Sequence, residues 1–466
     1  MRAPRARAAS ALRVLTAARV FVACVDDTRA DAATSPRAFA AFQTDAPPYD
    51  ATVAAGPQHL LAALNYEVKI FDKSGHTLRV AGLDAWFSNV VAGAQLFDPY
   101  ALYDHHADRF ILLAAARNVA ADQYWLVLSV SDSPDPLGTW RNSADGPTTA
   151  EDGWTDFPRA GLTADALYIT RNIITGTDAQ SFNHKSTQLR VVAKATLYGG
   201  GELTTRDVPL EAPDGTVPGT VHPCHAYGAP AVQYLVSTFR FQQGSAPKSR
   251  NVFLWEVTGG ATSPQVSRHV LAAPSEYGRP LPAIPQVGMV DPNSLKLWGL
   301  ACNDDRPRSA VFRSGSVWTA FNTSVPDGHG GTRNVVTWLE IAVASRTIVQ
   351  QGCYGAPGCH YAYPAIMPDS HGNAVVVAVR SSPTEHASLL IAHRLASMPA
   401  GVLHNSSELI QAGLATHQKL DSQGANRWAD YNGIALDPTD DRIWVHGAVP
   451  EDIDTWASWI SSWKAP

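Results

Sequence analysis

A strand–turn–strand unit recurs along the chain, and this repeat limits the possible fold more than any other feature. In each copy an apolar run reaches a short group of Asp, Pro, Asn or Gly residues, and a second apolar run follows. These residue types are typical of the tight turns between antiparallel strands. The turns lie near Pro57, Asp104, Ala164, Ala229, Asp291, Ser370 and Pro438.

Roughly 50 to 80 residues separate successive turns, a period that indicates a propeller or a solenoid. One four-stranded blade needs about this length, and rings of about four to eight blades are common. The sequence therefore predicts an all-β fold, a seven-bladed β-propeller forming a single domain over residues 49–466. Residues 33–48 are predicted to be extended, and residues 38–42 to add a strand to the last blade, so that the N- and C-terminal strands close the ring. Residues 211–220, 240–250, 322–334 and 399–426 read as loops.

The beginning of the chain reads as a targeting segment, residues 1–32. Arg2, Arg5 and Arg7 make a basic start, an apolar stretch follows, and Ala30-Asp31-Ala32 is a candidate cleavage site. Alternatives are a lipoprotein cleavage box ending at Cys24 and a leader without a targeting role. We therefore expect a secreted, periplasmic or extracellular protein. No later stretch is long and apolar enough to span a membrane.

The net charge of the sequence indicates which classes of partner the protein can bind. The net charge is −6, and no run of Lys or Arg occurs after residue 20. This argues against nucleic acid as a partner. We expect a monomer that contacts a carbohydrate polymer.

The chain has five cysteines, and Cys24 falls within the predicted leader. Cys353 and Cys359 lie in one Gly/Pro-containing loop and are predicted to form a disulfide, as suits an exported chain. Cys224 and Cys302 could pair or stay free. A zinc site is the weaker alternative, because no Cys-x-x-Cys pair exists.

Seven stretches of the sequence share a common pattern of apolar runs and turns: residues 98–104, 107–110, 131–140, 363–366, 369–373, 380–385 and 427–445. They resemble a family of exported, largely uncharacterised β-propeller proteins known chiefly from bacteria. The resemblance covers roughly residues 50–463 and implies a propeller fold and export, but no activity. Ala429 stands where such proteins often have Gly. Residues 133–140 also look like a stretched sialidase Asp-box, a turn device whose Asp, Gly and Trp have structural roles.

Polar residues recur just before the turns, on the strands that would line a central channel. Because these strands are equivalent in successive blades, their side chains should converge in space, and ligands favour such concave places. Channel-facing Asp and Tyr can equally cap strands and hold water. The candidate catalytic residues are Asp98, Asp156, His222, His225, Tyr361, Arg427 and Asp430, and the candidate substrate-binding residues are Trp154, Gln286, Tyr363 and Trp428.

Metal sites are weakly indicated, and the cofactor is unknown. His222 and His225 could hold Zn²⁺, but their spacing on a strand puts the two side chains on opposite faces. Residues 437–441 could bind Ca²⁺ through carboxylates, although a plain hairpin turn explains them better.

Two functions remain open. The first is an enzyme acting on extracellular polysaccharide at the channel. Uronate β-elimination through Arg427, a histidine and Tyr361 is slightly favoured over glycoside hydrolysis by two carboxylates. The second is a non-catalytic propeller that binds a glycan or a protein partner.

Overall fold

The computed structural model describes residues 24–27, 38–46, 48–177, 182–211, 217–238, 248–288, 299–421 and 424–466. The fold is all-β. Within the described ranges the helices are α1 (Leu83–Trp86) and α2 (Lys194–Gly199), and η1, a 3-10 turn, covers Val119–Ala121. None of the helices in these ranges is long and apolar enough to span a membrane.

Four sheets have four antiparallel strands each. Their apolar runs and Asp- or Gly-containing turns match the repeated unit of the sequence. The first is β3 (Thr52–Ala55), β4 (His59–Ala63), β5 (Glu67–Asp72) and β6 (Thr77–Gly82), and the second is β7 (Gln95–Asp104), β8 (Arg109–Asn118), β9 (Gln123–Ser131) and β10 (Trp140–Thr148). The third is β26 (His360–Pro368), β27 (Ala374–Ser382), β28 (Glu385–Arg394) and β29 (Glu408–Gln411), and the fourth is β30 (Gly433–Leu436), β31 (Ile443–Pro450), β32 (Trp456–Trp463) and β2 (Phe39–Thr44).

A 14-stranded sheet joins three further groups of strands through short bridges. The first group is β11 (Trp154–Leu162), β12 (Ala166–Thr175), β13 (Asn183–Ala193) and β14 (Thr205–Pro209). The second is β15 (His222–Pro223), β17 (Gln233–Ser237), β18 (Lys248–Thr258) and β19 (Gln265–Gly278), with β16 (His225–Ala226) as a bridge. The third is β22 (Ser309–Arg313), β23 (Ser316–Pro326), β24 (Thr332–Ala342), β25 (Thr347–Gly355) and β1 (Val25–Asp26). A separate pair is β20 (Ala283–Ile284) and β21 (Leu300–Ala301).

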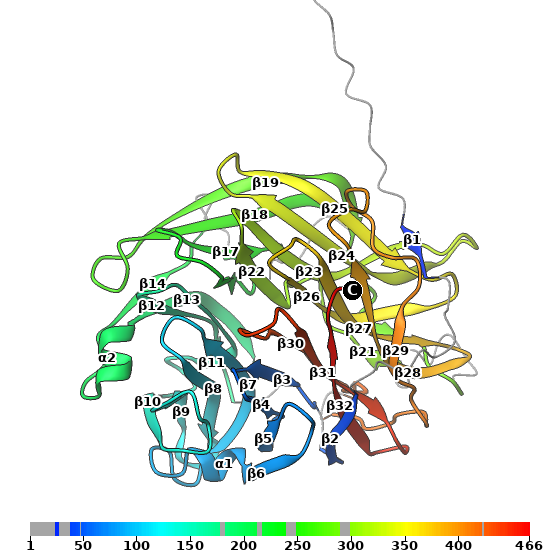
Figure 1. The fold of residues 1–466 in the computed structure, drawn as a ribbon. Coiled ribbons are helices and arrows are strands. Elements are labelled where there is room, and N and C mark those ends of the chain that lie inside the picture. The colour runs from blue at the N-terminus through cyan, green and yellow to red at the C-terminus, as the bar shows by residue number, and fades with distance from the viewer. Residues whose placement is uncertain are drawn as a thin grey trace, which may run out of the picture.

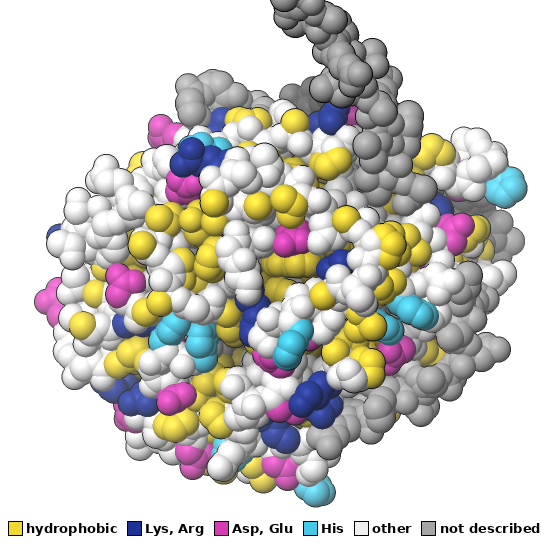
Figure 2. All heavy atoms as spheres, turned by 45° about the horizontal axis from the view of Figure 1, so that its top comes forward, with side chains coloured by type: hydrophobic (Ala, Val, Ile, Leu, Met, Phe, Trp, Pro, Cys, Tyr) yellow, Lys and Arg dark blue, Asp and Glu magenta, His cyan; other side chains and the backbone are white. Residues whose placement is uncertain are grey.

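The first strands of the groups surround the middle of the molecule. In Figure 1, β3, β7, β11, β22, β26 and β30 lie around the centre, and β6, β10, β14, β19 and β25 lie toward the periphery. This arrangement is propeller-like and brings the residues before each turn toward a common axis. On the face drawn in Figure 2, hydrophobic, charged and histidine side chains are interspersed, and no single sign of charge covers a continuous area.

The predicted pairing of residues 38–42 with the last strand is confirmed. β2 pairs antiparallel with β32, and Phe39 lies opposite Ile460. Phe42 is buried and packs against Phe71 and His446. The N-terminal strand therefore completes the sheet that the C-terminal strands begin.

Three predicted loops are wrong in part, because strands continue into their polar residues or form among them. β18 begins at Lys248, within residues 240–250. β23 and β24 extend into residues 322–334, and β29 lies within residues 399–426. The predicted turn at residues 289–298 lies outside the described residues.

The predicted disulfide between Cys353 and Cys359 is also wrong. Cys353 is bonded to Cys24, Cys224 and Cys302 are buried free thiols, and Cys359 is buried. The bond is possible because β1, directly after Cys24, pairs with β25, which carries Cys353. A leader cleaved after residue 32 would remove this strand.

Candidate functional site

Three of the inner strands share a bulge at an X-Pro step. Asp98, Phe157 and Tyr363 have φ angles of 53°, 49° and 54°, and each precedes a proline where the strand register shifts. Proline has no N–H to give to the ladder, which favours a bulge at this place. The bulge turns the N–H of the preceding residue away from its own sheet.

Side chains from neighbouring sheets accept these N–H groups. Asp98 donates its N–H to Asn65 Oδ1 at 2.8 Å, and Phe157 donates to Asp98 Oδ2 at 2.9 Å. Tyr363 donates to Asn322 Oδ1 at 3.0 Å. Each bond joins two groups of strands, so these buried polar side chains hold the inner strands together around the axis.

Three aspartates meet at this place. One carboxylate oxygen from each of Asp50, Asp98 and Asp430 lies within 4.8 Å of the other two. Asp430 donates its N–H to Asp50 Oδ1 at 2.6 Å, and Asn65 Nδ2 donates to Asp50 Oδ2 at 2.8 Å. Asp98 and Asp430, predicted from distant parts of the sequence, are therefore neighbours.

Arginines balance these carboxylates. Arg427 Nη2 lies 3.1 Å from Asp430 Oδ2. Arg306 forms a bidentate pair with Asp304, and both of its hydrogen bonds are 2.7 Å long. The charges of Arg306 and Asp430 both act on Asp156, so Asp156 belongs to the same cluster. We call Asp50, Asp98, Asp156, Asp430, Arg306 and Arg427 the central cluster.

Solvent reaches one part of the central cluster. The side chains of Arg427 and Asp430 are 24% and 14% exposed, whereas Asp98 is 5% exposed and Asp50 is fully buried. A ligand would therefore meet Arg427 and Asp430 before it reached Asp98.

The environment drives the carboxyl pKa values apart. Burial, helped by the charges of Asp156 and Asp430, raises the pKa of Asp98 to about 7. Burial also raises the pKa of Asp50 and of Asp156. For Asp430, burial acts in the same direction, but Arg427, Arg306 and the Asn303 amide outweigh it and hold the pKa below its usual range. One neutral acid beside one carboxylate is the charge state that acid–base catalysis needs.

Arg159 adds a buried positive charge next to Asp98. Its guanidinium lies 3.6 Å from the centroid of the Phe157 ring and 3.7 Å from that of Tyr431. It opposes the rise in the pKa of Asp98. Stacking between two rings fixes this group, which favours a structural role in the channel wall.

A divalent cation would find oxygen ligands at Asp50, Asp98 and Asp430. Both oxygens of Asp50 and of Asp430, and one oxygen of Asp98, already accept N–H donors. These donors compete for the lone pairs that Ca²⁺ requires. The contacts therefore fit a hydrogen-bonded carboxylate cluster better than a cation site.

The two histidines lie elsewhere. His222 on β15 is fully buried, its Nδ1 lies 3.0 Å from the Pro223 carbonyl oxygen, and burial lowers its pKa to about 3. His225 lines a cavity of about 40 Å³ among the first strands of the groups. This volume accommodates water and is too small for a sugar ring.

Tyr361 serves a different cluster, around the N-terminal strand β1. Its hydroxyl donates to Asp27 Oδ2 at 2.8 Å, and Arg380 Nη1 lies 2.8 Å from the same oxygen. Ser407 donates to Asp27 through both its N–H and its hydroxyl. The Tyr361 hydroxyl therefore helps to hold residues 24–27 in place.

The four predicted substrate-binding residues are buried. Trp154 packs against Tyr124, and Trp428 packs edge-on against Tyr49 and Trp456. Tyr363 donates its hydroxyl to the Ala301 carbonyl, and Gln286 donates to the His417 carbonyl. None of the four presents an open surface for a sugar, and all four contribute to packing between strands.

Sequence reasoning missed Asp50, Asn65, Asp304 and Arg306. A usable signal was present at residues 303–308, where Asn, Asp, Asp, Arg, Pro and Arg follow one another in a chain with only 17% charged residues. Asp50 lies at the junction before the first strand and has no sequence signal of its own.

No protein-family model matches the chain, and no curated protein matches it. Among solved structures, the Trypanosoma rangeli sialidase in complex with sialic acid is 11% identical with a TM-score of 0.39, over 92% of this chain and 59% of that protein. A variant of the Synechocystis apocarotenoid oxygenase is 13% identical with a TM-score of 0.43, over 78% of this chain and 74% of that protein. The chain thus spans little more than half the length of the sialidase. These distant similarities say nothing about the reaction.

Proposed function

We propose that the chain is an exported, seven-bladed β-propeller that hydrolyses glycosidic bonds of an extracellular carbohydrate at the central cluster. Support for the blade count is that four separate four-stranded sheets, the last completed by β2, stand beside three groups of strands within the 14-stranded sheet. Support for export is the Cys24–Cys353 bond, because disulfides persist in oxidising compartments. We further propose that residues 49–466 act as one monomeric unit.

The pair Asp98 and Asp430 carries the proposal. A glycosidase needs one protonated carboxyl group to protonate the leaving oxygen and one carboxylate as base or nucleophile. Asp98, with a pKa raised to about 7, is the proposed acid, and Asp430, held ionised by Arg427, is the proposed carboxylate. Asp156 adds negative charge that keeps Asp98 protonated, and Arg427 can bind a substrate oxygen.

Hydrolysis has more support than β-elimination, the reaction that the sequence slightly favoured. Elimination needs a base and a proton donor beside Arg427. The Tyr361 hydroxyl is bound to Asp27, and His222 is fully buried and bonded to its own strand. Two carboxylates, in contrast, lie within 4.8 Å of each other in the central cluster.

The test is digestion of acidic and neutral polysaccharides by the full chain, Asp98→Asn, Asp430→Asn and the control Asp327→Asn. Asp327 is an aspartate in an exposed turn. We expect new reducing ends without ultraviolet absorbance from unsaturated uronates, a loss of at least about 100-fold in the first two variants, and none in the control. Absorbance with product would establish elimination instead. Equal activity in all variants would exclude the central cluster.

A second candidate is the non-catalytic binding propeller. The observation that favours it is the engagement of the central carboxylates in hydrogen bonds between sheets, which alone explains their burial. No product from any substrate, together with a lower melting temperature of Asp430→Asn, would favour this function.

A further inference from the structure

Two open hollows adjoin at the outer edge of the second sheet, away from the central cluster. Their volumes are about 340 Å³ and about 350 Å³. The first lies between β10 and the β6–α1 segment, and the second lies between β10 and the α2 region. Figure 1 shows β10, α1 and α2 at the periphery. Each volume falls within the range of about 300–1,000 Å³ found for small-ligand sites.

Trp140, the first residue of β10, lines both hollows. Its indole N–H donates to the Pro136 carbonyl at 2.8 Å. The ring packs edge-on against Trp86 with a centroid distance of 5.0 Å, and Trp86 in turn donates its N–H to Ser129 Oγ at 3.0 Å. The half-buried Trp140 ring is therefore fixed in orientation before any ligand arrives.

Polar groups surround this ring. Asn142 also lines both hollows, and its Nδ2 donates to the Trp86 carbonyl at 2.6 Å and to Asn89 Oδ1 at 2.8 Å. Asn89 is exposed and is the third residue common to both hollows. Arg79 is exposed, its guanidinium lies 4.7 Å from the Trp86 ring centroid, and no described carboxylate pairs with it.

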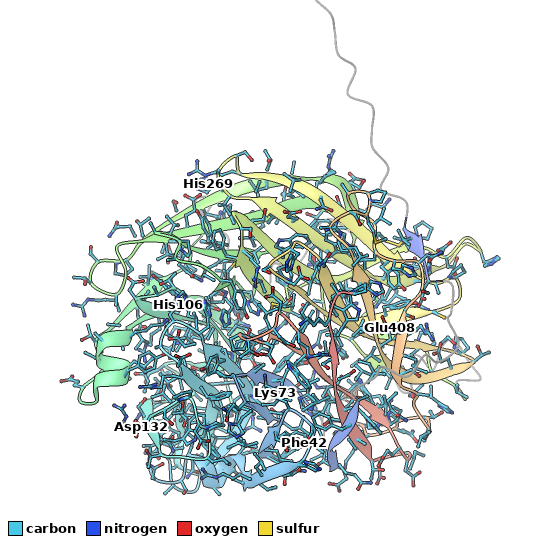
Figure 3. All side chains as sticks on the ribbon, in the orientation of Figure 1. Phe42, Lys73, His106, Asp132, His269 and Glu408 are labelled. Carbon is cyan, nitrogen blue, oxygen red and sulfur yellow. A yellow bond between two sulfur atoms is a disulfide. The ribbon has the colours of Figure 1, made fainter. Side chains whose placement is uncertain are left out.

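Arg141 lines the second hollow and holds β10 in position through two hydrogen bonds. Arg141 Nε donates to Asp132 Oδ1 at 2.5 Å, and Arg141 Nη2 donates to the Tyr198 carbonyl at 2.8 Å. Figure 3 labels Asp132 at the outer rim of the molecule. The bond to Tyr198 joins β10 to α2, and the bond to Asp132 lies within the β9–β10 hairpin, so Arg141 fixes β10 against α2.

We propose that these two hollows form a non-catalytic oligosaccharide-binding site, in which one sugar ring stacks on Trp140 and its hydroxyl groups bond to Asn89 and Arg79. We call Arg79, Asn89, Trp140 and Asn142 the rim site. A rigid aromatic ring combines a large apolar surface with a fixed orientation, and amide and guanidinium groups are donors suited to hydroxyl oxygens. The two hollows share Asn89, Trp140 and Asn142 along β10, and this shared edge gives room for several linked sugar units. The rim site does not depend on the central cluster being catalytic.

The test uses the Asp98→Asn/Asp430→Asn background, in which the central cluster cannot consume the probe. Binding of neutral and uronate-containing oligosaccharides is measured by titration calorimetry with and without Trp140→Ala. The matched control is Trp459→Ala, a half-buried tryptophan of β32 outside both hollows. We expect Trp140→Ala to weaken binding at least 10-fold and Trp459→Ala to leave it unchanged.

Two further variants test the rim site even if Trp140→Ala does not fold. Asn89→Ala and Arg79→Ala change exposed side chains, and each should weaken binding about 3-fold or more at an unchanged melting temperature. Stronger loss with uronates than with neutral sugars in Arg79→Ala would show that Arg79 pairs with a carboxylate of the glycan. Absence of binding to any probe, or equal binding by the background protein, Trp140→Ala and Asn89→Ala, would overturn the rim site. Neither outcome bears on hydrolysis, which is measured separately with Asp98→Asn.

Discussion

Asp98 combines a structural contact with a shifted pKa. It accepts the Phe157 N–H across a sheet boundary, and its φ of 53° places it in the left-handed region, where non-glycine residues are uncommon. Burial next to Asp156 and Asp430 makes ionisation costly. Phe157 and Tyr363 share the left-handed φ, so what distinguishes Asp98 is its buried, mutually repelling carboxyl group.

The raised pKa of Asp98 predicts a pH-dependent stability. Its pKa is about 7 in the folded protein and about 4 in an unfolded chain. The folded state therefore holds a proton that the unfolded state loses, so this residue lowers stability as pH rises from about 4 to about 7.

Asp98→Asn retains the acceptor for Phe157 and should be more stable than the original protein by roughly 2 kcal/mol at pH 8, with no gain at pH 4. Denaturant unfolding at both pH values measures this. An equal effect at both values would show that ionisation is not the cause.

Substitution of Asp27 should lower the stability of the fold, in contrast to Asp98→Asn. Its carboxylate is buried against Arg380, Tyr361 and Ser407. Asp27→Ala should lower the free energy of unfolding by about 3 kcal/mol, because it removes one partner of a buried ion pair. The neighbouring Asp26→Ala changes an exposed residue and should cost under about 1 kcal/mol. Equal losses in urea unfolding of the two variants would contradict a specific role for Asp27.

At the scale of elements, the strand β1 connects the N-terminal region to β25. Cys24 forms the disulfide with Cys353, and the Asp27 cluster follows three residues later. The strand itself pairs through only two residues, Val25 and Asp26. A two-residue strand gains little from its own hydrogen bonds, so the covalent bond and the buried aspartate must hold it in place.

This attachment predicts which cysteines of the protein are oxidised. Peptide mapping without reduction should find Cys24 linked to Cys353, with Cys224 and Cys302 as thiols that alkylate only after unfolding. A Cys353 thiol in the mature protein would mean that the leader is cleaved after Cys24.

The bulges explain which site residues the sequence could indicate. Repeated turns placed Asp98, Asp156 and Asp430 near one axis, since equivalent strands converge. Trp154 and Tyr361 lie on strands with X-Pro bulges, and a strand has two faces, so the sequence alone does not decide which face each side chain occupies. The pairing of Cys353 depended on a distant segment, which local spacing could not show.

At the scale of the whole molecule, β2 makes the last sheet four-stranded. Phe42 is its main anchor: it is 3% exposed, stacks on His446 with a centroid distance of 5.5 Å, and lies 4.6 Å from Lys69 Nζ. Lys69 also donates to the Ala41 carbonyl at 3.0 Å. The first sheet and the last sheet therefore both bind β2.

Phe42→Ala should weaken this connection strongly. Removing a fully buried phenylalanine costs about 3–5 kcal/mol, and here the loss falls where the two ends of the chain meet. Phe182→Ala is the matched control, because Phe182 is 43% exposed and should cost under about 1 kcal/mol. Thermal unfolding of both variants checks this. A small effect of Phe42→Ala would mean that the fold does not depend on β2.

The pairing of Phe39 with Ile460 also sets the order of events during biosynthesis. The ribosome releases β2 early, but its partner β32 is among the last segments to be made. The β2–β32 pairing therefore cannot form during translation, and the emerging chain has an incomplete sheet until synthesis ends. A chain with this pairing acquires its final stability only after its C-terminal strands have been made.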